Sequence, residues 1–161
     1  MKIVRLFAML LAAILAAPLP AQQGELERIR TEKKAWVALN MELTPAEAEN
    51  FWPVYEGYQK ELHQLNIRLT RLIETYALHY RNNSLTDESA RKLTEESLAV
   101  DEDELKLRKT YLPRLAKALP ARKVARYLQL EGRIHTQVRY ELASNLPLAG
   151  DFKLGAPRAT K

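Results

Sequence analysis

The chain of 161 residues contains no cysteine and only five glycines. Without cysteine no disulfide can form, so side-chain packing alone must stabilise the fold. Gly57 and Gly132 are the only glycines that lie away from the two ends of the sequence. A β-sheet protein of this length needs more turn residues than that. We therefore predict an all-α fold.

Sequence motifs of catalysis are also missing. There is no nucleophile elbow, no glycine-rich phosphate loop and no Ser/His/Asp spacing typical of hydrolases. The three histidines are His63, His79 and His135. His63 and His79 lie sixteen residues apart on one expected helix, and the resulting separation of about 24 Å is too large for a shared ion. We expect no enzymatic activity, no metal site and no cofactor.

Neither sign of charge dominates the sequence. The chain has 25 Lys and Arg against 20 Asp and Glu, and two of the basic residues lie in the first five positions. An excess of this size is small for a protein that binds a polyanion. We expect no nucleic-acid partner.

The first 21 residues have the three parts of a secretory signal peptide. Lys2 and Arg5 precede an uncharged apolar run from Leu6 to Leu19, and the small Ala21 suits the position before a cleavage site. The apolar run is shorter than the roughly 20 residues that a membrane span needs. We expect cleavage after Ala21 and a mature protein in the periplasm. An uncleaved N-terminal anchor is the alternative interpretation.

Apolar residues recur at helical spacing in four segments. These cover about 25–41, 45–82, 86–118 and 120–146, and Pro113 is expected to bend or break the third. The second and third carry heptad seams, which favour packing along a partner helix. We predict four antiparallel helices in an elongated hairpin arrangement, one helical domain over 22–146 and a disordered basic tail over 147–161. The seams are Tyr55, Tyr58, Leu62, Leu65, Leu69, Leu72 and Tyr76 in the second, and Ala90, Leu93, Ser97, Val100, Glu104, Leu107 and Tyr111 in the third.

The start of the second helix carries a specific capping signal. Leu43 precedes Thr44 at the N-cap, Pro45 occupies the first helical position, and Glu47 follows three residues after the cap. Thr and Glu at this spacing can satisfy each other's free backbone N–H groups. The aromatic residues around this motif are expected to form the core where the first helix folds onto the second. They are Trp36, Phe51, Trp52, Tyr55 and Tyr58.

The stretch 38–58, which reads ALNMELTPAEAENFWPVYEGY, resembles the periplasmic LTXXQ-motif group of Spy- and CpxP-like proteins. It is most similar to the periplasmic heavy-metal sensor-like branch, and the segment from Leu119 to Glu131 resembles the last helix of that branch. Glu47 stands where the motif has Gln, and Ser89 ends the later LTDES segment, which indicates a subgroup. The resemblance implies a four-helix hairpin pair, commonly dimeric, that acts in chaperoning or envelope-stress sensing.

Charges segregate along the third and fourth helices. Residues 87–104 hold eight acids and two bases, whereas 105–130 hold eight bases and no acid. Glu102 and Glu104 are expected to pair with Lys106 and Arg108 at the favourable spacing of four. The bases form a candidate surface for a client, a partner protein or a lipid headgroup; neutralisation by the acidic stretch of a dimer mate is the other interpretation. They are Lys106, Arg108, Lys109, Arg114, Lys117, Arg122, Lys123 and Arg126, interleaved with Leu107, Tyr111, Leu112, Leu115, Leu119 and Val124.

These patterns favour an exported helical binding protein that acts as an ATP-independent chaperone or as an envelope-stress accessory factor. Its expected partners are unfolded or envelope proteins, and a homodimer is expected because thin helical hairpins bury little surface by themselves. The alternative function is a signalling module that docks on an inner-membrane regulator, such as a sensor kinase or an anti-sigma factor.

Overall fold

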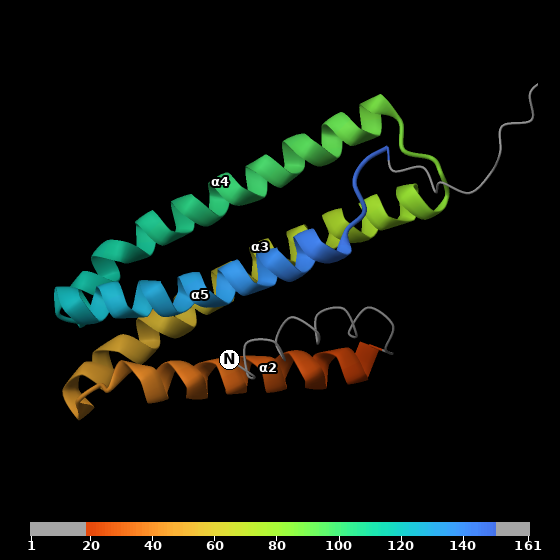
Figure 1. The fold of residues 1–161 in the computed structure, drawn as a ribbon. Helices are drawn as coiled ribbons and strands as arrows, with labels where there is room; N and C mark the ends of the chain where they lie inside the picture. Colours follow the sequence, from red (N-terminus) through yellow and green to blue (C-terminus); the bar gives the residue numbers. More distant parts are fainter. Residues whose placement is uncertain (1–18, 151–161) are drawn as a thin grey trace, which may run out of the picture.

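The computed structural model describes residues 19–150, with side chains from Arg28 onward. Within that range the chain forms four helices and no strand: α2 (Leu19–Met41), α3 (Pro45–Arg81), α4 (Asp87–Ala118) and α5 (Ala121–Asn145). Consecutive helices run antiparallel, and α3 and α4 form a long hairpin (Figure 1). The predicted all-α, four-helix arrangement is confirmed.

The helix ends lie close to their predicted positions, except at the N-terminus. There α2 begins at Leu19, six residues before the predicted start, so the expected cleavage point after Ala21 lies in its first turn. The rest of the expected signal peptide, residues 1–18, lies outside the described residues. No helix in the described part of the chain is both long and apolar enough to cross a membrane.

The chain after α5 is described only as far as Gly150. Residues 147–150 are not helical, and the carbonyl of Pro147 accepts a hydrogen bond of 2.7 Å from the Tyr76 hydroxyl of α3. The start of the predicted disordered tail is thus hydrogen-bonded to α3, while residues 151–161 lie outside the described residues.

Thr44 and Glu47 form the predicted capping box at the start of α3. The Thr44 hydroxyl accepts from the Glu47 amide at 3.3 Å, and the Glu47 carboxylate accepts from the Thr44 amide at 2.8 Å. A second box caps α4, where Thr86 and Ser89 exchange the same two bonds at 3.2 and 2.9 Å. Serine therefore replaces the acidic residue at the third position, because its hydroxyl reaches the same amide.

Neither internal proline breaks its helix, so the break considered at Pro113 is absent. Pro53 in α3 and Pro113 in α4 are both exposed, and each helix continues through its proline. A proline removes one backbone hydrogen bond of the helix. Despite this lost hydrogen bond, buried residues two positions before and after each proline hold both helices to the core. They are Phe51 and Tyr55 around Pro53, and Tyr111 and Leu115 around Pro113.

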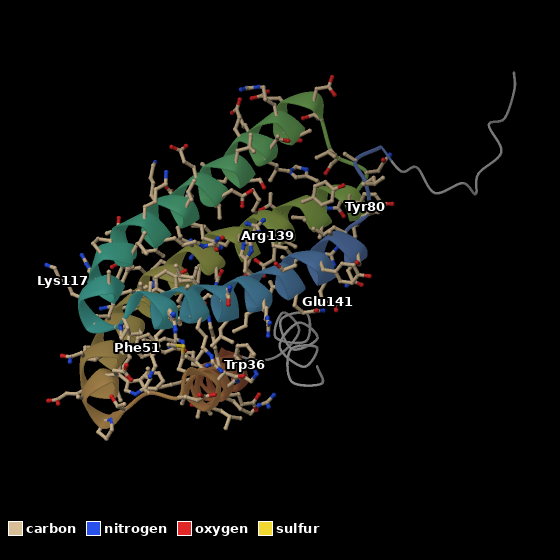
Figure 2. All side chains as sticks on the ribbon, turned by 60° about the vertical axis from the view of Figure 1, so that its left-hand side comes forward. Trp36, Phe51, Tyr80, Lys117, Arg139 and Glu141 are labelled. Atoms are coloured by element: carbon tan, nitrogen blue, oxygen red, sulfur yellow. The ribbon has the colours of Figure 1, made fainter. Side chains whose placement is uncertain are left out.

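The hydrophobic core lies at one end of the molecule, where α2, α3, α5 and the last turns of α4 meet (Figures 1 and 2). Of the five expected core aromatics, Phe51, Tyr55 and Tyr58 are buried, and both tryptophans pack against the core, as does Leu43. Tyr127 of α5 completes the cluster. Its ring is fully buried and meets Phe51 edge-on, with 5.1 Å between the ring centroids. Such edge-to-face pairs are favourable beyond the apolar area that they bury.

The far half of the α3–α4 hairpin is built differently. No residue between 59 and 99 is buried, and the seam residues in this range are at most half-buried. Ion pairs connect the helices instead: Arg68 of α3 pairs with Glu96 at 2.9 Å and with Asp103 at 2.7 Å. Nearer the core, the helices approach closely at Gly57, where a Cβ atom would lie 3.0 Å from the Tyr111 hydroxyl.

Candidate functional site

Four of the eight predicted surface bases are neutralised by acidic side chains of the same chain. Lys106 lies 3.1 Å from Glu102, and Arg108 pairs with Glu104, as the spacing of four predicts. Lys123 and Arg126 connect α5 to the α2–α3 turn. Lys123 pairs with Glu47 at 2.5 Å and donates to the Glu42 carbonyl at 2.8 Å, and Arg126 pairs with the Glu42 carboxylate at 3.1 Å.

The other four bases have no acidic partner among the described residues. Lys109, Arg114, Lys117 and Arg122 are all exposed, and the Arg114 guanidinium lies over the Tyr111 ring, 4.6 Å from its centroid. Arg114, Lys117 and Arg122 occupy the end of α4 and the first turn of α5, and we call these three the basic corner. Figure 2 shows Lys117 at the outer end of α4.

The prediction that the apolar residues between the bases belong to the same exposed surface is wrong. Of the residues interleaved with the bases, five are buried in the core, and only Leu112 is exposed, at 46%. The helical period explains the difference, because four of these residues share the face of α4 or α5 that packs inward while the bases point outward; the fifth, Leu119, is the C-cap of α4. The apolar groups exposed beside the basic corner are smaller: Pro113, Ala116, Pro120, Ala121 and Ala125. The five buried residues are Leu107, Tyr111, Leu115, Leu119 and Val124.

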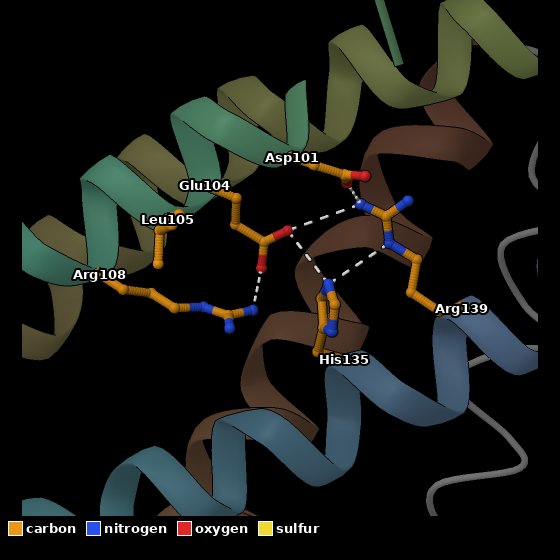
Figure 3. A pocket seen from close by; sticks show the side chains of 6 residues that line it. All are labelled: Asp101, Glu104, Leu105, Arg108, His135 and Arg139. Carbon is orange, nitrogen blue, oxygen red and sulfur yellow. Dashed lines mark hydrogen bonds and ion pairs between the residues drawn. The ribbon is translucent and has the colours of Figure 1, made fainter. Parts of the chain in front are cut away.

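A hollow of about 340 Å³ lies between α4 and α5 and is lined largely by charged side chains (Figure 3). Glu104 lies at its centre. One carboxylate oxygen pairs with Arg108, and the other accepts from His135 Nε2 at 3.1 Å and lies 3.8 Å from Arg139. Arg139 also pairs with Asp101. The lining charges are therefore paired with one another across the two helices.

The electrostatics of Glu104 bear on whether this hollow suits proton transfer. Burial opposes the charged carboxylate, but the hydrogen bonds and positive charges of His135 and Arg108 outweigh it and lower the pKa of Glu104 to about 2. A carboxylate with so low a pKa is a weak general base near neutral pH. The arrangement suits an ion-paired connection between α4 and α5 better than acid–base chemistry.

A second polar network, inside the packed end, connects three helices. Lys33 of α2 donates to Gln59 of α3 at 2.8 Å and pairs with Glu131 of α5 at 2.8 Å. Gln59 in turn donates to Glu131 at 2.9 Å and to the Tyr127 hydroxyl at 3.3 Å. The Lys33 and Glu131 side chains are only 13% and 8% exposed. Burial, together with the negative charge of Glu131, raises the pKa of neighbouring Tyr58 to about 12.

The contacts that both networks make with α5 were not predicted, although the sequence carries a signal for each. Glu104 occupies a seam position of the third predicted helix, and Lys33 falls on the apolar face of the first. A charged residue at a buried position requires a partner of opposite charge. The partners His135 and Glu131 lie on α5, and only the three-dimensional arrangement brings them near.

No group of three or more metal-ligating side chains converges anywhere in the described part of the chain. A comparison of the chain with protein-family models, with curated proteins and with solved structures gives no match.

Proposed function

We propose that this protein is an exported, ATP-independent helical binding protein that holds partly unfolded envelope proteins, as a chaperone or an envelope-stress accessory factor. The basic corner is the observation that carries the proposal. Arg114, Lys117 and Arg122 are exposed and have no acidic partner within the described residues, whereas four neighbouring bases are paired. Positive charge that the described residues leave unpaired is available to an acidic segment of another protein.

The surroundings of the basic corner suit an unfolded client. Small apolar groups lie between the bases, namely Pro113, Ala116, Pro120 and Ala121, and all are exposed. Charge attracts the client over a distance set by the ionic strength, and small apolar contacts then hold it weakly. Weak and reversible contacts allow release without ATP hydrolysis. The resemblance of residues 38–58 to the LTXXQ group supports the same function.

Light scattering of a chemically denatured client, diluted with and without an equimolar amount of the protein, tests the proposal. We expect the protein to suppress aggregation, and added salt to weaken the suppression. The triple variant Arg114→Glu, Lys117→Glu and Arg122→Glu should lose at least half of it while keeping its helical circular dichroism. Equal scattering with and without the wild-type protein would refute the chaperone proposal and favour the signalling module.

A matched control separates the position of the charges from their number. Lys60, Arg71 and Arg133 are exposed and likewise lack acidic partners within the described residues, but they lie outside the basic corner. Reversing these three to Glu changes the net charge by the same amount. We expect this control to protect the client nearly as well as the wild type. Equal loss in both triple variants would show that net charge matters and the basic corner does not.

A further inference from the structure

The chain that follows α5 lies against the far end of α3. Leu146, the C-cap of α5, already has an extended backbone, with φ at −86° and ψ at 127°. Pro147 comes next, and proline both keeps the residue before it extended and cannot continue a helix. Figure 1 shows this segment running from α5 toward the turn between α3 and α4. We call residues 146–150 the strap.

The strap meets α3 at a pair of tyrosines. Tyr76 and Tyr80 lie one helical turn apart, and their rings stack with 6.4 Å between the centroids and 28° between the planes. The Tyr76 hydroxyl donates to the Pro147 carbonyl at 2.7 Å. Leu146 and Pro147 are half-buried, whereas Leu148 is 73% exposed. The tyrosine pair therefore holds a short extended segment that contains a proline.

We propose that Tyr76 and Tyr80 form a binding surface for an extended, apolar, proline-containing segment of another polypeptide chain, and that the strap occupies this surface as an internal competitor. Aromatic rings give such a segment a flat apolar surface, and a tyrosine hydroxyl can donate to its backbone. An extended segment with proline makes no hydrogen bonds within itself, so its carbonyls are free to accept. Proline also fixes the backbone beforehand, which lowers the entropy lost on binding.

The contact between the strap and α3 can be exchanged without unfolding the helices. No residue between 59 and 99 is buried, so the strap lies on the part of α3 that the core supports least. Segments with few buried contacts detach locally at a small fraction of the stability of the whole protein. Because the strap belongs to the same chain, its effective concentration is high. Only a segment that contacts the tyrosines better than the strap does can therefore displace it.

The tyrosine pair is separate from the basic corner. Tyr80 lies at the end of α3 and Lys117 at the end of α4, and these ends are opposite because the two helices run antiparallel (Figure 2). Peptide binding at the tyrosines therefore goes beyond the proposed function. It is measured with an isolated peptide and involves neither the basic corner nor a denatured client, so either proposal can fail while the other stands.

Titration of the ¹⁵N-labelled full chain with a synthetic peptide of residues 144–150, SNLPLAG, tests the surface by NMR. In the double variant Leu146→Ser with Pro147→Ser, the strap competes poorly. We expect this variant to bind the peptide about tenfold more tightly than the wild type does, with chemical-shift changes confined to residues around the tyrosine pair. The same peptide with Pro147→Ser should bind several-fold more weakly. Absence of binding to the double variant, or equal affinity of the wild type and the double variant, would overturn the proposal.

Two tyrosine variants separate the specific contact from a general effect. Added to the double variant, Tyr76→Phe removes only the hydroxyl donor and should weaken peptide binding about fivefold. Tyr140→Phe, on α5 and 67% exposed, is the matched control and should leave binding unchanged. In the otherwise wild-type chain, Tyr76→Phe should lower the ¹⁵N heteronuclear NOE of residues 148–150, and Tyr140→Phe should not. Equal results for the two Phe variants in either measurement would overturn the proposal.

Discussion

The two halves of the long α3–α4 hairpin are stabilised in different ways. At the packed end, α2 and α5 lie against the hairpin, and twelve hydrophobic side chains are buried together, among them Phe51, Tyr58 and Tyr127. In the open half, no residue between 59 and 99 is buried, and exposed ion pairs such as Arg68 with Asp103 join the helices. Both halves have the same helical pattern in sequence, so burial depends on which neighbours cover the seam.

This difference indicates where stability and binding reside. Apolar burial is the dominant favourable term in folding, and exposed ion pairs add little. Most of the stability should therefore come from the packed end, where the basic corner also lies.

The two halves should differ most in the free energy of unfolding that is lost when a large side chain is removed. Phe51→Ala leaves a cavity beside Tyr127 and should lower the free energy of unfolding by about 3–5 kcal/mol. Leu72→Ala in the open half removes a half-buried side chain and should lower it by about 1 kcal/mol. Urea denaturation of both variants, at one protein concentration, measures the two losses. Similar losses would show that the open half is packed as tightly as the other.

The buried ion pair of the packed end should also contribute more to stability than the exposed ion pairs of the open half. This difference should be smaller than the difference between the apolar side chains. Glu131→Gln leaves the Lys33 ammonium ion buried without its counter-charge and should destabilise the protein by about 3 kcal/mol. The double variant Lys33→Met with Glu131→Leu should recover much of this loss, because no unpaired charge then remains buried. Arg68→Met, which removes two exposed pairs, should leave the urea midpoint nearly unchanged. A larger shift for Arg68→Met than for Glu131→Gln would contradict this comparison.

Local signals in the sequence were sufficient to predict the four helices and the cap of α3. The Thr44 and Glu47 spacing predicts a box that the structure contains, and the spacing of four predicts the pairs of Glu102 with Lys106 and Glu104 with Arg108. Features that depend on contacts between helices could not be predicted in this way. The partners of Lys123 and Arg126 lie about eighty residues away on the α2–α3 turn, so the basic surface looked larger than it is.

The break considered at Pro113 and the predicted exposure of the apolar residues depend on contacts between helices as well. Proline favours a break or a bend, but burial of Tyr111 and Leu115 on either side of Pro113 keeps α4 one helix. Leu112 and Leu115 are equally apolar in sequence, yet one is exposed and the other buried. Only the position of α3 and α5 around α4 decides which face turns inward.

Amide hydrogen exchange of the purified protein tests the contrast between the halves most directly. The account predicts that amides of residues 69–81 and 87–96 open locally, at a small fraction of the free energy of global unfolding. Amides of residues 54–58, 111–115 and 124–131 should exchange only through global unfolding. Equal protection across the hairpin would contradict the account, since it would show that the open half and the packed end unfold as one cooperative unit.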